Sequence, residues 1–157
     1  VAELCHLFGC EIAAYDLFPK KNAPDYLHYG TLEEVLSKSD IVTLHCPLTE
    51  DSKNLINQDR IAQMKKGAIL INAARGPIVD SKALADALNS GYLRGAGVDV
   101  FEMEPPLPMD HPLLHSINTI VTPHIAFASD ESMEIRAEIV FENIQKWMNK
   151  EQVNIIL

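Results

Sequence analysis

Apolar segments and segments of helical periodicity alternate along the whole chain. Short runs rich in Ile, Val, Leu and Ala predict strands at residues 11–16, 41–45, 68–72, 95–100 and 119–122. Candidate helix-capping residues stand outside these runs, at Thr31 with Glu34, Asn57, Asp80 or Ser81, and Ser129. Because the strand runs are almost uniformly apolar, the pattern is typical of a parallel sheet that is covered on both faces.

This order of elements predicts an α/β protein with a doubly wound parallel sheet. We expect one domain over residues 1–150 and a tail at residues 151–157 that leaves it. The chain begins at Val1, inside a helical pattern, so we also expect it to be cut at its N-terminus.

The composition narrows the classes of partner. The chain has 157 residues, a formal net charge of −9, 47% hydrophobic residues and 22% charged residues. These values are typical of a soluble globular protein, and the negative charge argues against nucleic acid or an anionic membrane as a partner. Cys5, Cys10 and Cys46 follow no metal-binding spacing, so we interpret them as reduced thiols of a cytoplasmic protein.

Polar side chains with useful chemistry gather where the predicted strands end. In chain order they are Asp16, Cys46 with Pro47, Arg75, Asp99 and His124, with Glu104 in the loop after Asp99. The carboxyl ends of parallel strands lie along one edge of a sheet. We therefore expect these residues to converge on one ligand-binding cleft.

The most informative stretch is residues 69–77, an apolar strand that stops at Asn72 and is followed by the cation Arg75. A guanidinium just beyond a strand end can hold a small carboxylate with two parallel hydrogen bonds. The alternative is an ordinary surface arginine in a loop, and its position alone does not separate the two interpretations.

His124, Glu104 and Asp16 each have an ordinary structural interpretation too, as a structural histidine, a solvated loop acid and an acid that ends a strand. As a pair, however, the Glu104 carboxylate can hold His124 as an imidazolium, which donates a proton near neutral pH. Asp16 can accept hydrogen bonds from the adenosine ribose and repel a 2′-phosphate, which favours NAD over NADP.

No metal site is predicted. His111 and His115 are four residues apart, but Pro112 lies between them. A zinc-protease helix also needs a Glu directly after the first histidine, and here that position is Pro112.

Five segments, in this order and spacing, resemble the D-isomer-specific 2-hydroxyacid dehydrogenases. They are residues 15–16, 45–49, 72–76, 97–105 and 122–126. Each segment is weak alone, but together they are specific and cover essentially the whole chain. The resemblance implies a Rossmann-like NAD-binding domain from an oxidoreductase, which transfers a hydride between NAD(H) and a small D-2-hydroxyacid or 2-oxoacid.

The resemblance also implies residue roles. Arg75 would bind the carboxylate and carbonyl of the oxoacid, His124 would protonate the carbonyl oxygen, and Glu104 would hydrogen-bond His124. The cofactor-binding residues that it implies are Asp16, Cys46, Pro47, Ser52, Ala74, Arg75, Asp99, His124 and Ala126. Phe127 and the proline-rich loop at residues 105–112 look more like the glycerate dehydrogenase and hydroxypyruvate reductase branch, and the family usually forms homodimers.

One part of the family pattern is missing from this sequence. It contains no Gly-x-Gly-x-x-Gly phosphate loop, and Val1 matches a position just after that loop. We therefore expect the predicted strand at residues 11–16 to lack a neighbour on one side, and the 157 residues alone to be inactive. Two alternatives to the enzyme stay open, which are an NAD(H)-responsive module similar to the related transcriptional corepressors and an inactive fragment.

Overall fold

The computed structural model describes residues 1–103 and 106–155. It divides into two compact units, residues 1–123 and residues 124–157, and each is described by itself. The domain boundary expected at residue 150 stays a prediction.

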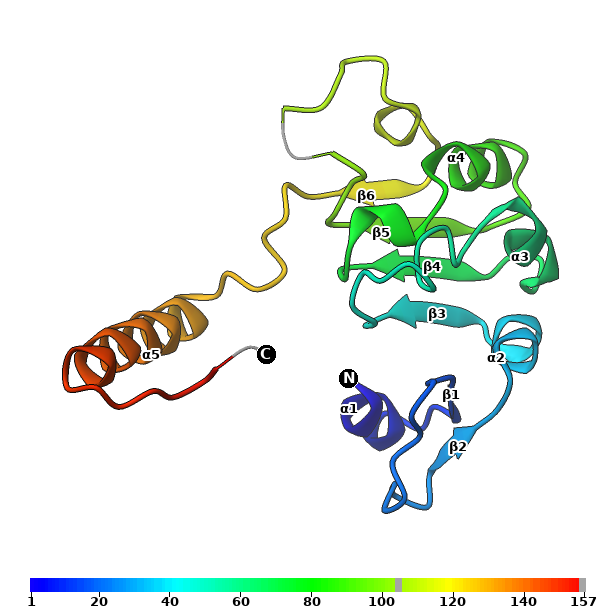
Figure 1. The fold of residues 1–157 in the computed structure, drawn as a ribbon. Coiled ribbons are helices and arrows are strands. Elements are labelled where there is room, and N and C mark those ends of the chain that lie inside the picture. The colour runs from blue at the N-terminus through cyan, green and yellow to red at the C-terminus, as the bar shows by residue number, and fades with distance from the viewer. Residues whose placement is uncertain (104–105, 156–157) are drawn as a thin grey trace. The chain divides into compact units, whose positions relative to one another are not determined.

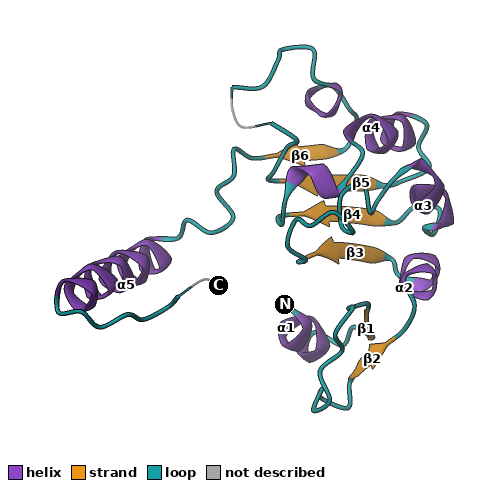
Figure 2. Cartoon of the chain, in the orientation of Figure 1, coloured by secondary structure: helices purple, strands orange, loops and turns teal. Residues whose placement is uncertain are grey.

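The first unit contains a parallel sheet with the order β3-β4-β5-β6. Its strands are β3 (Ile41–Leu44), β4 (Ile69–Asn72), β5 (Gly95–Val98) and β6 (Thr119–Val121). Leu44 lies opposite Asn72, Asn72 opposite Val98, and Val98 opposite Val121. The four strands run in the same direction, so the segments that follow them leave from one edge of the sheet (Figure 2).

Helices α2 (Leu32–Lys38), α3 (Gln58–Gln63) and α4 (Ser81–Asn89) pack on this sheet (Figure 1). Each begins at a predicted cap, because the side chains of Thr31, Asn57 and Asp80 accept a backbone N–H of the first turn. The core joins Leu36, Ile61 and Leu84 of these helices to alternate strand residues, among them Val42, Leu70 and Val98. Ile41 and Ile71 point to the other face and are exposed, so within the first unit the sheet is covered on one side.

A second, two-stranded parallel sheet pairs β1 (Ile12–Ala14) with β2 (Leu27–Tyr29), next to the short helix α1 (Ala2–Leu7). The sequence pattern had not predicted β2, which has only three residues. In the described part of the chain, β1 pairs with β2 alone and β3 with β4 alone. Both strands therefore leave one edge of backbone N–H and C=O groups unpaired, as expected for the strand near residues 11–16.

The second unit consists of the segment from His124, the helix α5 (Asp130–Met148) and the residues after it. Ser129 begins α5 with a capping box, as its sequence predicts. No residue of α5 is buried, and its large apolar side chains, among them Val140 and Trp147, are exposed. Among the described helices, none is long and apolar enough to cross a membrane.

Substitutions of two adjacent residues of β4 test whether the core lies on only one face of the sheet. Leu70 is fully buried, whereas Ile71 on the opposite face is 38% exposed. Leu70→Ala removes packed methyl groups and leaves a cavity, so it should lower the free energy of unfolding by about 2–5 kcal/mol. The matched Ile71→Ala should cost clearly less in the same urea titration. Equal losses for the two variants would contradict the core described here.

Candidate active site

A buried amide shapes the turn after β4. Asn72 is 2% exposed, its Oδ1 accepts the N–H of Ala74 at 3.1 Å, and its Nδ2 donates to the carbonyl oxygen of Arg75 at 3.0 Å. The Asn72 carbonyl oxygen also accepts the N–H of Asp99 at 2.9 Å. The backbone around Arg75 is therefore tied to the sheet edge. The sequence analysis interpreted Asn72 only as the end of a strand. A polar residue at the end of an apolar strand was the signal for this role, because a buried polar side chain needs hydrogen-bond partners.

Glycine is required at the next position. A Cβ on Gly76 would lie 1.8 Å from the carbonyl carbon and oxygen of Phe101, and 2.5 Å from the backbone nitrogen of Glu102. Gly76 begins the short helix η1 (Gly76–Ile78). The turn after β4 and the segment after β5 thus touch backbone to backbone, which no side chain would allow.

The side chain of Arg75 is exposed at this edge. Its Nη1 donates to the carbonyl oxygen of Ala74 at 2.7 Å, so the side chain folds back on its own turn. Among the described residues, no acidic side chain forms an ion pair with Arg75. Its guanidinium is consequently a cation that can receive an anionic ligand.

A buried carboxylate lies at the same edge. Asp99 is 5% exposed, and its Oδ1 accepts the hydroxyl of Thr122 at 2.5 Å. The N–H of Thr122 donates to the carbonyl oxygen of Val98 at 3.0 Å. These bonds join the ends of β5 and β6 and hold the Asp99 carboxyl group close to the turn that carries Arg75.

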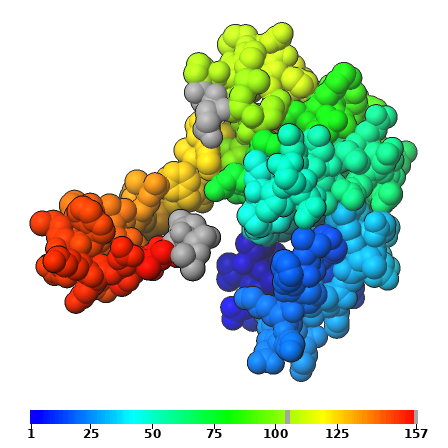
Figure 3. Space-filling model, in the orientation of Figure 1, coloured from blue at the N-terminus to red at the C-terminus, as the bar shows by residue number. Residues whose placement is uncertain are grey.

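Asp16 and Cys46 come from different sheets but interact. Burial raises the pKa of the Cys46 thiol, and the negative charge of Asp16 raises it further. In Figure 3 the blue N-terminal segment adjoins the cyan part of the chain, in agreement with this interaction. Asp16 Oδ1 accepts the N–H of Phe18 at 2.8 Å, which fixes the turn after β1. All three cysteines are free thiols.

Ser52 closes the loop after β3. Its hydroxyl donates to the carbonyl oxygen of Pro47 at 2.7 Å and accepts the N–H of Thr49 at 2.7 Å. Ser52 is only 8% exposed. Its observed role is to shape the loop that follows Cys46, and its contact with a cofactor stays a prediction.

A polar cluster that the sequence reasoning missed lies beside Gly76. Glu102 Oε1 bonds His111 Nε2 at 3.1 Å, and Glu102 Oε2 accepts the hydroxyl of Ser81 at 2.7 Å. Burial by itself would raise the pKa of Glu102, but hydrogen bonds from Ser81, its own backbone and His111 outweigh burial and hold the pKa below its usual range. His111 had been weighed only as a metal ligand, and no pattern along the chain pairs it with Glu102.

His124 and Ala126 belong to the second unit. The backbone of His124 has a φ of 58°, in the left-handed region that few residues other than glycine adopt. Its ring packs edge-on against Phe127 with 5.8 Å between centroids, and Arg136 lies over the Phe127 ring at 5.3 Å. Strained backbone of this kind is frequent at functional sites.

Glu104 lies outside the described residues. Since Arg75 and His124 also belong to separate units, the predicted grouping of Arg75, Glu104 and His124 stays a prediction. What the structure brings together in the first unit is Arg75, Ala74 and Asp99 at the edge of one sheet, with Asp16 interacting with Cys46.

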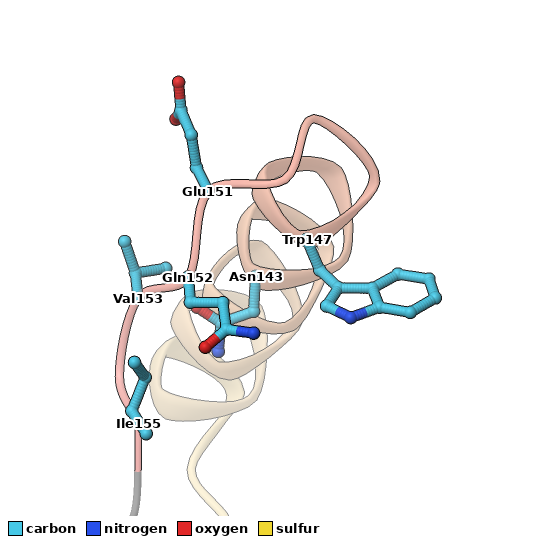
Figure 4. Close-up of a pocket in the computed structure, with 6 residues that line it drawn as sticks. All are labelled: Asn143, Trp147, Glu151, Gln152, Val153 and Ile155. Atoms are coloured by element: carbon cyan, nitrogen blue, oxygen red, sulfur yellow. The ribbon is translucent and has the colours of Figure 1, made fainter.

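Two other features do not belong to this site. An open pocket of about 270 Å³ in the second unit is lined by Asn143, Trp147, Glu151, Gln152, Val153 and Ile155, none of them a predicted site residue (Figure 4). Within residues 1–103 and 106–155, no group of three or more His, Cys, Asp or Glu side chains could hold a metal ion. His115 Nε2 instead bonds the carbonyl oxygen of Met109 at 2.6 Å.

Comparison with known proteins assigns the family. The family model described as D-isomer specific 2-hydroxyacid dehydrogenase, NAD binding domain, matches residues 1–126. The chain belongs to this family. That result confirms the resemblance of the five segments and NAD as the cofactor, and with the parallel sheets and their flanking helices it confirms the Rossmann-like α/β fold.

Individual relatives agree with the family model. A glycerate dehydrogenase from Methylorubrum extorquens is 40% identical over 99% of this chain and 48% of its own length. A glyoxylate reductase from Korarchaeum cryptofilum is 44% identical over 92% of this chain and 44% of its own length. The chain therefore spans about half the length of the curated relatives that it matches.

Solved structures show the same fold. A D-lactate dehydrogenase with NAD⁺ from Lactobacillus jensenii superposes with a TM-score of 0.89 at 32% identity, over 99% of this chain and 51% of that one. A D-lactate dehydrogenase from Treponema pallidum has a TM-score of 0.91 at 35% identity, over 99% and 51% of the two chains.

The residues of this family member fit a dinucleotide at the sheet edge. Asp16 follows β1, where an acid can accept hydrogen bonds from ribose hydroxyls. The loop shaped by Ser52 and the buried carboxylate of Asp99 border the same edge after β3 and β5.

Glu102, Ser81 and His111 form one hydrogen-bonded group, the Glu102 cluster. We expect its contribution to the free energy of unfolding to depend on pH. Because its folded-state pKa is lowered below the unfolded value of about 4.3, ionised Glu102 stabilises the fold above that value. This contribution is lost as the pH falls through the lowered pKa. Glu102→Gln should therefore be less stable than the unsubstituted protein in urea titrations at about pH 6, and the difference should narrow at about pH 3.

Ser81→Ala is the control, because it removes one of the two side-chain donors to Glu102. Its loss of stability should be smaller than that of Glu102→Gln and follow the same pH trend. A Glu102→Gln difference that is equal at the two pH values would contradict the network.

Proposed function

We propose that this chain supplies the NAD-binding half of a dehydrogenase that interconverts a small 2-oxoacid and the D-2-hydroxyacid. The main support is the exposed Arg75 guanidinium, on a turn held by Asn72 and Gly76, in a member of this family. A planar cation at the carboxyl edge of the sheet is suited to a carboxylate next to a carbonyl.

In this proposal Arg75 binds the carboxylate and orients the carbonyl of the oxoacid. His124 gives its proton to the carbonyl oxygen while C2 receives the hydride, and it takes the proton back when the alcohol is oxidised. Glu104 hydrogen-bonds His124 and favours its protonated form. Asp16 holds the adenosine ribose, and Cys46, Pro47, Ser52, Ala74, Asp99 and Ala126 line the cofactor.

The substrate range and the assembly are also part of the proposal. The glycerate dehydrogenase and the glyoxylate reductase among the relatives favour a two- or three-carbon substrate such as glyoxylate or hydroxypyruvate. We further propose a cytoplasmic homodimer that binds neither nucleic acid nor membrane, which agrees with the net charge of −9. The relatives named here are dehydrogenases and reductases, which gives the corepressor alternative no support.

Substitution at Arg75 and His124 tests the mechanism. In the full-length gene product, assayed by NADH oxidation with glyoxylate, hydroxypyruvate and pyruvate, Arg75→Lys should lower kcat/KM about 10- to 100-fold because bidentate binding is lost. His124→Ala should lower kcat about 100-fold or more because the proton donor is lost.

Arg60→Lys is the matched control for Arg75→Lys, because Arg60 instead bonds the carbonyl oxygen of Leu55 within its own helix and loop region. It should leave kcat/KM close to that of the unsubstituted protein. Turnover that survives both Arg75→Lys and His124→Ala would overturn the assigned roles.

The 157-residue chain alone should show no turnover with any of these oxoacids. Among residues 1–103 and 106–155, β1 and β3 each leave one strand edge unpaired, and the sequence has no glycine-rich turn for a pyrophosphate. NADH oxidation by the purified chain, checked against the full-length protein in the same assay, measures this. Turnover by the chain alone would refute the prediction.

A further inference from the structure

The Glu102 cluster joins three segments that are distant in the sequence. Glu102 follows β5, Ser81 is the first residue of α4, and His111 precedes the short helix η2 (Pro112–Leu114). The two oxygens of one carboxylate bond the other two members, at 2.7 Å to Ser81 and 3.1 Å to His111. Such a bridge restrains the segment after β5 from two sides.

The geometry of His111 defines the direction of its bond to Glu102. Its Nδ1 accepts the N–H of Leu113 at 3.3 Å, so in the neutral ring the proton lies on Nε2. Nε2–H then donates to Glu102. The ring is 3% exposed and packs edge-on against Phe101 with 5.3 Å between centroids, so it cannot rotate away without losing buried contacts.

The cluster also acts on the turn that carries Arg75. Phe101 and Glu102 are the residues whose backbone touches Gly76, with no room for a Cβ between them. Arg75 precedes Gly76, and its carbonyl oxygen accepts the N–H of Ile78 at 3.3 Å. A shift of the peptide between Phe101 and Glu102 therefore moves the turn against which it packs.

We propose that Glu102 is a positioning residue, which together with Ser81 and His111 holds this peptide against Gly76 and so sets the position of Arg75 for a 2-oxoacid carboxylate. The inference rests on the proposed function for the identity of the ligand. The mechanical link from Glu102 to the Arg75 turn does not depend on that function.

Steady-state kinetics of the full-length protein test the positioning role. Glu102→Ala removes both bonds and should raise KM for the 2-oxoacid about tenfold, with a much smaller change in kcat and in KM for NADH. Glu102→Gln should restore most of this loss, because its amide oxygen can accept from His111 and its amide nitrogen can donate to Ser81. Ser81→Ala removes only one of the two bonds and should raise this KM less than Glu102→Ala does.

Asp86→Ala is the matched control. Asp86 is an exposed acid on α4 whose side chain bonds Lys82 at 2.9 Å and, among the described residues, forms no hydrogen bond with Glu102. This variant should keep the KM of the unsubstituted protein. An unchanged KM in Glu102→Ala, an equal rise of both KM values, or a Gln variant as impaired as the Ala variant would overturn the positioning role.

Hydrogen exchange separates this inference from the proposed function. The amides of Ile78 and Val79 donate to Arg75 and Gly76, and they report directly on the turn. Their exchange should be faster in Glu102→Ala than in Asp86→Ala or the unsubstituted protein. Absence of any turnover by the unsubstituted protein would reject the proposed function, whereas unchanged exchange in Glu102→Ala would reject the positioning role.

Discussion

The row of Leu44, Asn72, Val98 and Val121 across four parallel strands is the constraint on which the candidate site depends. Hydrogen bonds of a parallel ladder fix where each strand ends, and here all four ends meet at one edge. The chain places buried polar groups at that row and directly beyond it, with the Asn72 amide in the row and the Asp99 carboxyl group just after Val98. The sheet thus acts as the rigid support from which Arg75 projects.

A close contact between two backbone segments also restrains the turn that carries Arg75. Gly76 allows the turn after β4 to lie on the peptide after Phe101, and the Glu102 cluster holds that peptide from the other side. Among the described side chains, no buried polar nitrogen or oxygen lacks a hydrogen-bond partner. Since an unsatisfied buried group costs about 1–3 kcal/mol, this complete pairing favours one arrangement of the turn over alternatives.

The predicted chemistry is divided between the two units. Arg75, the proposed anion-binding group, lies in the first unit, and His124, the proposed proton donor, begins the second with a left-handed backbone. Strained backbone such as that of His124 is frequent at functional sites, which agrees with a functional role for its side chain. The family model extends over the first unit and into the beginning of the second, where it ends at residue 126, so it includes both Arg75 and His124.

Much of the local structure could be predicted because it depends on neighbours in the chain. The caps at Thr31, Asn57, Asp80 and Ser129 are bonds across three residues, and all four are observed. Strands β3 to β6 follow from runs of apolar residues. The three-residue strand β2 was missed because so short a segment carries too little periodicity.

The sequence by itself determined the order of strands β3 to β6, the helix caps, the family and the residues placed at the ends of these strands. Only the tertiary structure decided that β1 pairs with β2 in a sheet of its own, that Gly76 meets the Phe101 peptide, and that Glu102 joins Ser81 to His111. Each of these contacts joins residues that lie apart along the chain. No local pattern encodes them, because they form only when packing brings separate segments together.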